Sequence, residues 1–548
     1  MKICVQAALV LLLSLPMFSC FTGSKQAWAG QNETPNKAPF RVLFSNDLTN
    51  TSSCVSPYHA EGQQWAPEMI EATVDETAAT GVEVHMLQPA HTWVPWWPSK
   101  VYPLKEHYRW WKSHYGIDIP KMPVHEYIRK GGDPFKLFIE RCRMKGLKPF
   151  ISIRLNDGHH LENVDKKNNK RGAHSICKFY VDNPQYRIGP GFGSWEQRVQ
   201  NWAIPEVRKY KFELIEEICR NYDITGLELD FMRHYSYFRL DKTTSKQRKA
   251  IMTSFVKDVR RVLDASSKNG EKRWLCVRIP CYLTMHDGLG IDVRSMAAAG
   301  VDMFNLSASY FTVHDADIAE ISKMAPGGCF YLEMCHTVYV GKKVAKGYDS
   351  NTFRRTTPNQ YYTAAHLAYS RGATGVSAFN FVYYREHGNG ERGPFNEPPF
   401  HVFKNIGNPD WVAKQPQHYI LAKMGLSKQF LQGKMPLLFD AAGQTRKFRM
   451  DMAPTKGGWK TDGKLRIQAE KDLADSFWTA KVNDVELKLA SDLSEPYNNP
   501  YTPLLGDDKV HRGWIVPRDI LKDGINNFEV TMKKGGKTRV EFIDLAIE

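Results

Sequence analysis

The stretch "TGLELDFMRH", residues 225–234, places two carboxylates inside an otherwise apolar run. In an extended strand, successive side chains alternate between two faces, so Glu228 and Asp230 share one face and the apolar residues between them the other. A buried carboxylate without a partner is very costly, so both acids need a structural or a chemical reason to be there.

Eight strand-like runs of this kind lie between residues 40 and 385, separated by stretches with helical periodicity such as 205–222 and 245–267. The runs are 41–47, 81–89, 147–157, 224–233, 274–282, 301–311, 329–336 and 372–381. Strands that alternate with helices are typical of a parallel sheet, and eight repeats predict a (β/α)₈ TIM barrel.

After the barrel the pattern changes to short strands separated by turns, which predicts a C-terminal antiparallel β-sandwich. We therefore expect a barrel over residues 40–424 and a sandwich over residues 425–548. Residues 1–29 combine an early Lys, an apolar run and "AWA" at 27–29, and they predict a signal peptide. A cut before Cys20, within "MFSC", is the alternative and would leave a lipid anchor.

No later stretch is apolar for long enough to cross a bilayer, so we expect an exported protein that is periplasmic, cell-surface or extracellular. The formal net charge is +15, and a basic protein concentrates polyanions near itself. Because the sequence has no compact Lys/Arg block and no nucleic-acid motif, the charge favours an acidic or sulfated polysaccharide over nucleic acid. A basic surface without a partner is the alternative.

Ten cysteines occur, two of them in the predicted leader. Their spacing is not that of a disulfide framework, which indicates buried thiols with a bridge or two. Neither a CxxC nor an HExxH pattern is present, so the sequence predicts no metal site.

The face shared by Glu228 and Asp230 should point to the barrel axis, with Asp230 nearer the C-terminal mouth, where barrel active sites are built. Glu228 is read as a buried acid paired to an arginine of a neighbouring strand, with catalysis as the alternative. Glu333, on the seventh strand, opens on the same face. Glycoside hydrolysis needs such a pair of carboxyl groups, which makes Asp230 and Glu333 the leading catalytic candidates. Asp287, after the fifth strand, is the reserve partner.

An acid after strand 4 and a Glu after strand 7 resemble the clan of retaining barrel glycosidases. The resemblance implies that Asp230 is the acid/base and Glu333 the nucleophile, although the chain lacks the Asn-Glu pair of that clan. "GLELDFMRH" is also similar to the G-[IL]-x-L-D-[YF]-x-R strand of the bacterial family-10-like glycosidase group, whose strand-4 Asp is held to be catalytic. Barrels of the α-galactosidase type carry a nucleophilic Asp on strand 4 but take their acid from strand 6 or its loops. The two roles therefore stay interchangeable.

The same resemblance implies that no cofactor is needed. In the predicted sandwich, residues 482–487 and 519–530 resemble the jelly-roll modules attached to many glycoside hydrolases, which implies a supporting role more than sugar binding.

Further residues are expected at the mouth as substrate contacts. They are His85, Arg154, Asn156, His159, His160, Arg233, Arg278, Asn305 and Tyr310. The guanidinium forks of the three arginines match carboxylate and sulfate geometry, and any that are not needed to neutralise Glu228 and Asp230 would bind an anionic sugar. A lone inward His such as His85 is more often a satisfied core residue.

The loop after the second strand, residues 91–116, is rich in Trp and Tyr. Trp96 and Trp97 are flanked by prolines and are the pair expected to be exposed, as flat platforms for sugar rings. The alternative is a small core that holds the loop down.

Together these features predict a secreted glycoside hydrolase that cleaves an anionic polysaccharide. Two alternatives remain. One is a non-catalytic glycan-binding protein on the same fold, because fold does not guarantee chemistry. The other is a polysaccharide lyase with Tyr310 or His159 as its base.

Overall fold

The computed structural model describes residues 40–53, 65–268, 270–339, 353–385, 397–422, 434–497 and 508–548. The predicted signal peptide, Cys20, Cys54 and the expected boundary at residues 424 and 425 lie outside the described residues and stay predictions. A search of the described helices finds none with the length and apolar character that a membrane span requires. Seven cysteines in the described ranges are buried free thiols.

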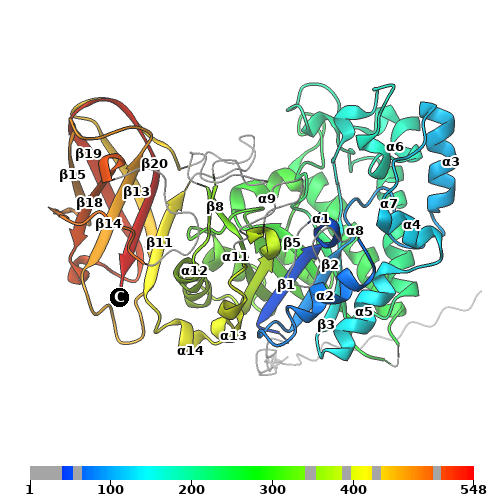
Figure 1. The fold of residues 1–548 in the computed structure, drawn as a ribbon, viewed down its shortest axis with the longest axis horizontal. Coiled ribbons are helices and arrows are strands. Elements are labelled where there is room, and N and C mark those ends of the chain that lie inside the picture. Colours follow the sequence, from blue (N-terminus) through cyan, green and yellow to red (C-terminus); the bar gives the residue numbers. More distant parts are fainter. Residues whose placement is uncertain are drawn as a thin grey trace, which may run out of the picture. The chain divides into compact units, whose positions relative to one another are not determined.

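Eight parallel strands close into a barrel in the order β1-β10-β7-β6-β5-β4-β3-β2 (Figure 1). The strands are β1 (Val42–Asp47), β2 (Val84–Gln88), β3 (Lys148–Arg154), β4 (Gly226–Asp230), β5 (Trp274–Pro280), β6 (Met303–Ser307), β7 (Cys329–Cys335) and β10 (Gly375–Phe379). Each of the eight runs singled out in the sequence contains one of these strands. The predicted TIM barrel is confirmed.

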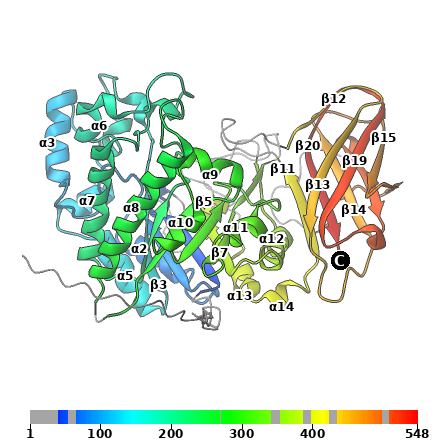
Figure 2. The ribbon, with the colours of Figure 1, turned by 180° about the vertical axis from the view of Figure 1, so that it is seen from behind.

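Helices surround the barrel, and the long pair α7 and α8 can be followed in Figure 2. The helices are α1 (Asn50–Ser53), α2 (Glu68–Asp75), α3 (Leu104–Tyr115), α4 (Pro123–Arg129), α5 (Pro134–Met144), α6 (Lys178–Asp182), α7 (Pro205–Asn221), α8 (Ser245–Ala265), α9 (Leu283–Leu289), α10 (Val293–Ala298), α11 (Ile318–Ser322), α12 (Pro358–Ser370), α13 (Phe403–Ile406) and α14 (Pro409–Val412). Helix α7 begins with Pro205, whose fixed φ suits a first helical position. A capping box formed by Thr244 and Gln247 starts α8.

The barrel interior has an apolar end and a polar end. Near the amino ends of the strands, an apolar cluster includes Leu43, Val84, Met86, Phe150, Met303 and Tyr331. Toward the carboxyl ends the buried residues are polar, among them Asp47, Gln88, Ser152, Arg154, Glu228, Asp230, Arg278, Asn305, Ser307 and Glu333. The predicted orientation of Glu228 and Asp230 toward the axis is therefore correct.

The expected inward orientation of His85 is wrong. Its ring packs edge-on against Phe44 and Phe138, with centroids 5.1 and 5.2 Å away, and its Nδ1 lies 3.1 Å from the hydroxyl of Thr77 at the end of α2. A shift of one residue in strand register moves every side chain to the other face. The inward position at the end of β2 belongs to Gln88 instead.

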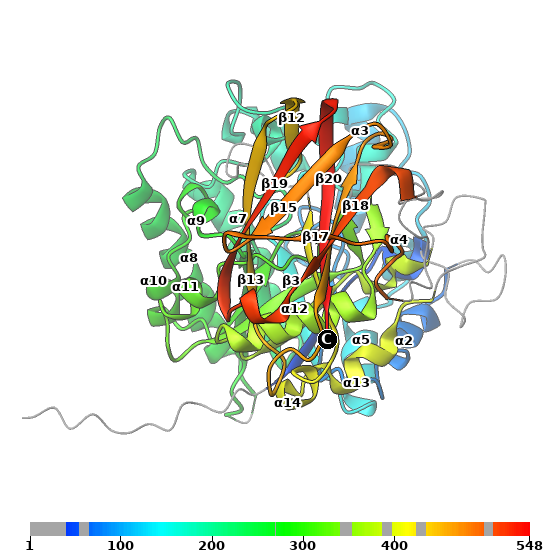
Figure 3. The same ribbon diagram turned by 90° about the vertical axis from the view of Figure 1, so that its left-hand side faces the viewer.

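Two antiparallel sheets form the C-terminal sandwich, and their strands can be followed in Figure 3. One sheet contains β11 (Gln417–Ala422), β12 (Leu437–Ala441), β14 (Gly463–Ala469), β17 (Lys488–Leu489), β18 (His511–Val516) and β20 (Gly536–Ile547), and the other β13 (Thr445–Met452), β15 (Phe477–Val482), β16 (Val485–Glu486) and β19 (Gly524–Lys534). Asn483 and Asp484 join β15 to β16 with φ of 48° and 70°, as a two-residue hairpin requires. A small two-stranded sheet, β8 (Thr337–Tyr339) with β9 (Phe353–Arg355), follows β7.

Candidate active site

Backbone strain gathers just past the carboxyl ends of the barrel strands. Five non-glycine residues there have positive φ, and they are Ala90, His160, His234, Ser309 and Asn380. They follow β2, β3, β4, β6 and β10. Each such conformation costs on the order of 1–3 kcal/mol and persists only because the surrounding structure holds it in place. Such strain clusters at functional sites, which supports a site at this end of the barrel.

The guanidinium of Arg278 lies between the two leading catalytic candidates. Its Nη1 donates to Asp230 Oδ1 at 3.0 Å, while its Nε and Nη2 donate to the two oxygens of Glu333, both at 2.6 Å. The ring of Phe379 covers the guanidinium at 4.1 Å. Residues of β4, β5 and β7 thus meet at one buried cation.

Both carboxylates are also held by neutral donors. Asp230 accepts from Gln88 Nε2 at 3.1 Å and from the Met232 amide at 2.7 Å. The hydroxyl of Ser307 donates to Glu333 at 2.6 Å. Burial raises the pKa of Glu333, and Arg278 only partly opposes this.

The shared arginine limits how far apart the two acids can be. The terminal nitrogens of one guanidinium are about 2.3 Å apart, so the nearest oxygens of Asp230 and Glu333 are at most about 8 Å apart. Retaining glycosidases place their carboxyl groups about 5–5.5 Å apart and inverting ones about 6.5–9.5 Å. The retaining separation and the lower part of the inverting range, up to about 8 Å, fit within this limit.

Glu228 lies deeper, and none of the arginines in the described ranges forms an ion pair with it, contrary to the prediction. It accepts hydrogen bonds from Ser152 Oγ at 2.6 Å and Asn305 Nδ2 at 3.0 Å, and from the Cys276 thiol at 3.5 Å. Burial and the nearby charge of Asp230 raise its pKa to about 7. The arginine on the neighbouring strand is bound by Asp230 and Glu333 instead.

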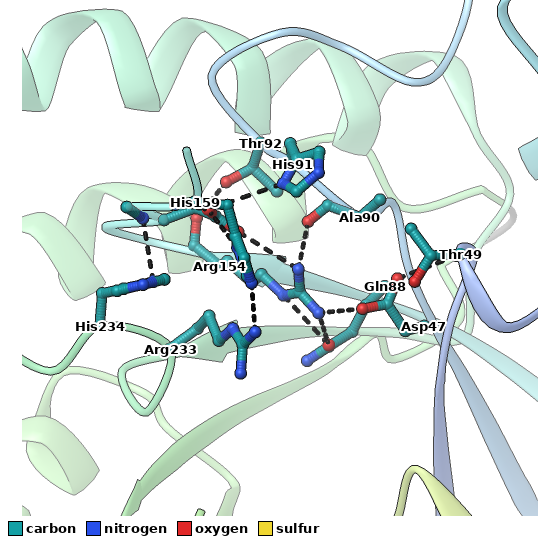
Figure 4. Close-up of polar contacts among 12 residues, drawn as sticks. Asp47, Thr49, Gln88, Ala90, His91, Thr92, Arg154, His159, Arg233 and His234 are labelled. Carbon is teal, nitrogen blue, oxygen red and sulfur yellow. Dashed lines mark hydrogen bonds and ion pairs between the residues drawn. The ribbon is translucent and has the colours of Figure 1, made fainter. Parts of the chain in front are cut away.

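The guanidinium of Arg154 is fully engaged within the protein, as Figure 4 shows. It forms ion pairs with Asp47 and Asp157, and it donates to the Ala90 carbonyl at 2.7 Å and to the Gln88 side chain at 3.1 Å. Arg154 therefore neutralises acids of the barrel and has no donor left for an anionic sugar.

Arg233 is the exception among the three arginines. Its Nη1 donates to the Tyr310 hydroxyl and its Nη2 to His159 Nε2, and both partners are uncharged acceptors. Its Nε is buried without a hydrogen-bond partner, and among the described residues no carboxylate forms an ion pair with its guanidinium. Arg233, half-buried at the mouth, carries a charge that the described part of the protein does not neutralise.

Histidines surround this arginine. His159 Nδ1 lies 2.7 Å from Asp157 Oδ1, and burial together with the charge of Arg233 holds the pKa of His159 well below its usual range. His234 accepts a hydrogen bond from the Gly158 amide at 2.9 Å (Figure 4). His160 is partly exposed beside them.

Three other expected contacts lie elsewhere. Trp96 and Trp97 are 0% and 1% exposed, so the expectation of an exposed pair is wrong. Trp97 donates to Glu217 at 3.0 Å and stacks on Phe135, which makes the loop a small core of its own. The Asn156 amide donates to the carbonyls of residues 200 and 236 and is occupied in joining two loops.

The reserve acid Asp287 is not near the others. It lies on α9 and forms ion pairs with Arg248 at 2.7 Å and Lys249 at 3.3 Å, with half of its side chain exposed. Asp47 and Gln88 are among the site residues that the sequence patterns did not single out. Both lie at the end of a barrel strand, in "RVLFSND" and "GVEVHMLQP", and this position was the available signal.

No protein-family model matches the chain, and no curated protein matches it. Solved structures with a weak likeness include a GH138 enzyme targeting pectin rhamnogalacturonan II, with 10% identity and a TM-score of 0.39. That match covers 68% of this chain but only 38% of the GH138 enzyme. A bacterial fucosidase has 11% identity and a TM-score of 0.35, with 90% of this chain and 93% of that one covered. The α-amylase of Geobacillus thermoleovorans has 13% identity and a TM-score of 0.37, with 90% and 99% covered. These neighbours are glycoside hydrolases.

Proposed function

We propose that the protein is a glycoside hydrolase that cleaves an O-glycosidic bond of an anionic polysaccharide. The observation that carries the proposal is the convergence of Asp230 and Glu333, from two distant barrel strands, on the guanidinium of Arg278. Two carboxyl groups at this separation, at the carboxyl ends of barrel strands, are what glycoside hydrolysis needs.

In this reaction one carboxyl group protonates the leaving oxygen while the other attacks the anomeric carbon or activates a water. Burial raises the pKa of Glu333, as an acid requires, while both of its oxygens accept hydrogen bonds from Arg278, as those of an ionised nucleophile do. Asp230 accepts from Arg278, Gln88 and a backbone amide, so the acid and nucleophile roles of the two residues stay interchangeable.

Arg233 supports an anionic substrate. A guanidinium that pairs with no carboxylate in the described part of the chain, beside a phenol and imidazoles, favours a uronate or sulfate group. Export through the predicted signal peptide would bring the enzyme to such polymers outside the cell, and anchoring at Cys20 remains part of this proposal as an alternative.

The hydrogen bonds of Arg233 also favour a second candidate, a polysaccharide lyase. Elimination needs a base near a carboxylate-bearing sugar, and Tyr310, held by Arg233 at the partly exposed mouth, fits that base. His159, the other base suggested by the sequence, accepts from the same guanidinium.

The products separate these candidates. We would incubate the full chain with a panel of uronic and sulfated polysaccharides and measure both new reducing ends and the ultraviolet absorbance of unsaturated sugars. Hydrolysis gives reducing ends without absorbance, elimination gives both, and a binding protein gives neither.

Two substitutions then test the acids. Asp230→Asn and Glu333→Gln should each lower the rate by about 10²- to 10⁴-fold, while Asp287→Asn, which changes an acid outside the cluster, should leave it unaltered. Full activity in both of the first two variants would refute the assignment.

A further inference from the structure

Three side chains at the mouth bring possible metal ligands together from two different loops. His91 follows β2, while Asp157 and His159 follow β3, and one donor atom from each lies within 4.8 Å of the other two. His91 Nδ1 is 3.7 Å from Asp157 Oδ1, and His159 Nδ1 is 2.7 Å from the same oxygen. Figure 4 shows His91 and His159 approaching each other.

We propose that His91, Asp157 and His159 bind a divalent transition-metal cation of the Zn²⁺ class. Two imidazoles and one carboxylate are a ligand set that suits zinc, with a further position left for water. Neighbouring ligand atoms of a tetrahedral zinc ion with bonds of about 2.0–2.1 Å are about 3.3 Å apart. The two distances to Asp157, 3.7 and 2.7 Å, lie on either side of this value, and the two imidazole nitrogens lie within 4.8 Å of each other, so a bound ion requires side-chain shifts of about 0.5 Å or more.

His91 provides the independent reason to expect a ligand. It is 9% exposed, and its Nδ1 is buried without a hydrogen-bond partner although it is directed toward Asp157. A buried polar atom normally has a partner, and leaving it without one costs on the order of 1–3 kcal/mol. The residue before it, Ala90, has a φ of 54°, so the chain is strained where it presents this ring. A cation between His91 and Asp157 would satisfy the orphaned nitrogen.

The surroundings provide outer contacts for the cluster. Arg154 donates to Asp157 Oδ2 at 3.2 Å and thereby holds the carboxylate with Oδ1 toward the histidines. In metalloproteins, hydrogen bonds from neighbouring residues to the metal-binding side chains orient those side chains. The other candidate cluster, His418, Glu495 and Asp544 in the sandwich, differs because Arg466 donates to both oxygens of Asp544, at 3.0 and 2.7 Å, whereas Arg154 donates only to Oδ2 of Asp157.

Metal binding has a definite consequence for Arg233. In the described state Arg233 donates to His159 Nε2, so the ring carries its hydrogen on Nδ1 and donates it to Asp157. When His159 Nδ1 binds a metal, the ring hydrogen moves to Nε2. The Nε2–H of His159 and the Nη2–H of Arg233 are then both donors and face each other. Arg233 must turn away from His159, which couples the metal to the mouth arginine that forms no ion pair with a carboxylate of the described residues.

The proposal does not depend on the enzymatic activity, and metal binding tests it directly. The full chain would be stripped with a chelator and titrated with Zn²⁺ by calorimetry, and with Co²⁺ by visible absorption. We expect one Zn²⁺ per chain with a Kd of about 1 μM or tighter, together with a Co²⁺ spectrum of nitrogen and oxygen ligands. His91→Ala should weaken Zn²⁺ binding at least tenfold, and because His91 Nδ1 makes no hydrogen bond, this variant should fold.

His114→Ala is the matched control, since His114 is an exposed histidine on α3 outside the cluster, and it should bind Zn²⁺ as the unaltered protein does. A chain that takes up no stoichiometric Zn²⁺, or a His91→Ala variant that binds as tightly as His114→Ala, would overturn the proposal. Should His91→Ala be unstable, the Co²⁺ titration of the unaltered protein decides, because nonspecific surface binding gives a six-coordinate spectrum of low intensity.

Discussion

Asp230 and Glu333 accept hydrogen bonds from the same guanidinium, that of Arg278, although they lie on strands β4 and β7. The shared cation reduces the repulsion between two carboxylates that are both almost fully buried. It also fixes their relative orientation before any substrate binds, and preorganised groups of this kind are what catalysis uses.

Replacing this arginine should destabilise the barrel strongly. Arg278→Met leaves two buried acids without a cation, and breaking a buried ion pair in this way costs about 3–5 kcal/mol. The loss should be smaller at acidic pH, where the acids take up protons, and urea unfolding at two pH values measures it. Arg261→Met, which removes an exposed pair with Asp258, should leave the midpoint unchanged. A midpoint in Arg278→Met equal to that of the control would show that the two acids do not depend on Arg278.

Removing the charge of Arg233 should weaken binding of anionic oligosaccharides only. Hydrogen bonds to charged groups contribute about 1.5–3 kcal/mol, so Arg233→Gln should raise the Kd for a uronic or sulfated oligosaccharide by about 10- to 100-fold. Binding of a neutral analogue should change little. Arg239→Gln is the control, because Arg239 lies on the same loop but already pairs with Asp241. Equal losses for charged and neutral ligands would argue against recognition of the anion.

Glu228 should make the protein less stable as the pH rises. Its pKa is raised from 4.5 to about 7 in the folded state, so between these values the unfolded chain releases a proton that the folded chain keeps. The protein therefore loses stability from pH 4.5 upward, and the loss is complete above pH 7. Glu228→Gln should remove this loss, so the free energy of unfolding of the variant should exceed that of wild type by about 1–3 kcal/mol between pH 5 and pH 8. Unfolding midpoints at these two pH values test it, and an identical pH dependence in the two proteins would contradict it.

His85 should contribute the opposite pH dependence. Burial lowers its pKa from 6.5 to about 3, so below pH 6.5 the unfolded chain binds a proton that the folded chain does not. Stability therefore falls as the pH falls through this range, by about 1.4 kcal/mol per pH unit for one such group. His85→Phe should reduce the slope between pH 6 and pH 4 by this amount. An unchanged slope would mean that His85 becomes protonated without unfolding.

The strands could be predicted because each leaves a local trace in the sequence. A run such as residues 224–233 combines length, apolar content and alternation, and the helices between such runs leave few topologies other than a barrel. The inward orientation of Glu228 and Asp230 followed from the same alternation. His85 shows the limit, because alternation fixes which residues share a face but not which face is the inner one.

The partners of the charged side chains could not be predicted. Glu228 was expected to bind an arginine, yet Arg278 bridges Asp230 and Glu333. The register pairs Arg278 with Asp230 on β4, and Glu333 lies two residues beyond the level of Arg278 on β7, where the long guanidinium side chain reaches it. Trp96 and Trp97 carry no sequence signal that separates a sugar platform from a small core, and only the packing against Phe135 and Glu217 decided it.

The sequence by itself thus determined the barrel, the sandwich and the set of acids that face the axis, since these depend on local periodicity. The tertiary structure decided which acids share a cation, which arginine keeps its charge free and which histidines meet at the mouth. These depend on distances between strands and loops that are far apart in the chain, and short-range patterns contain no information about such distances.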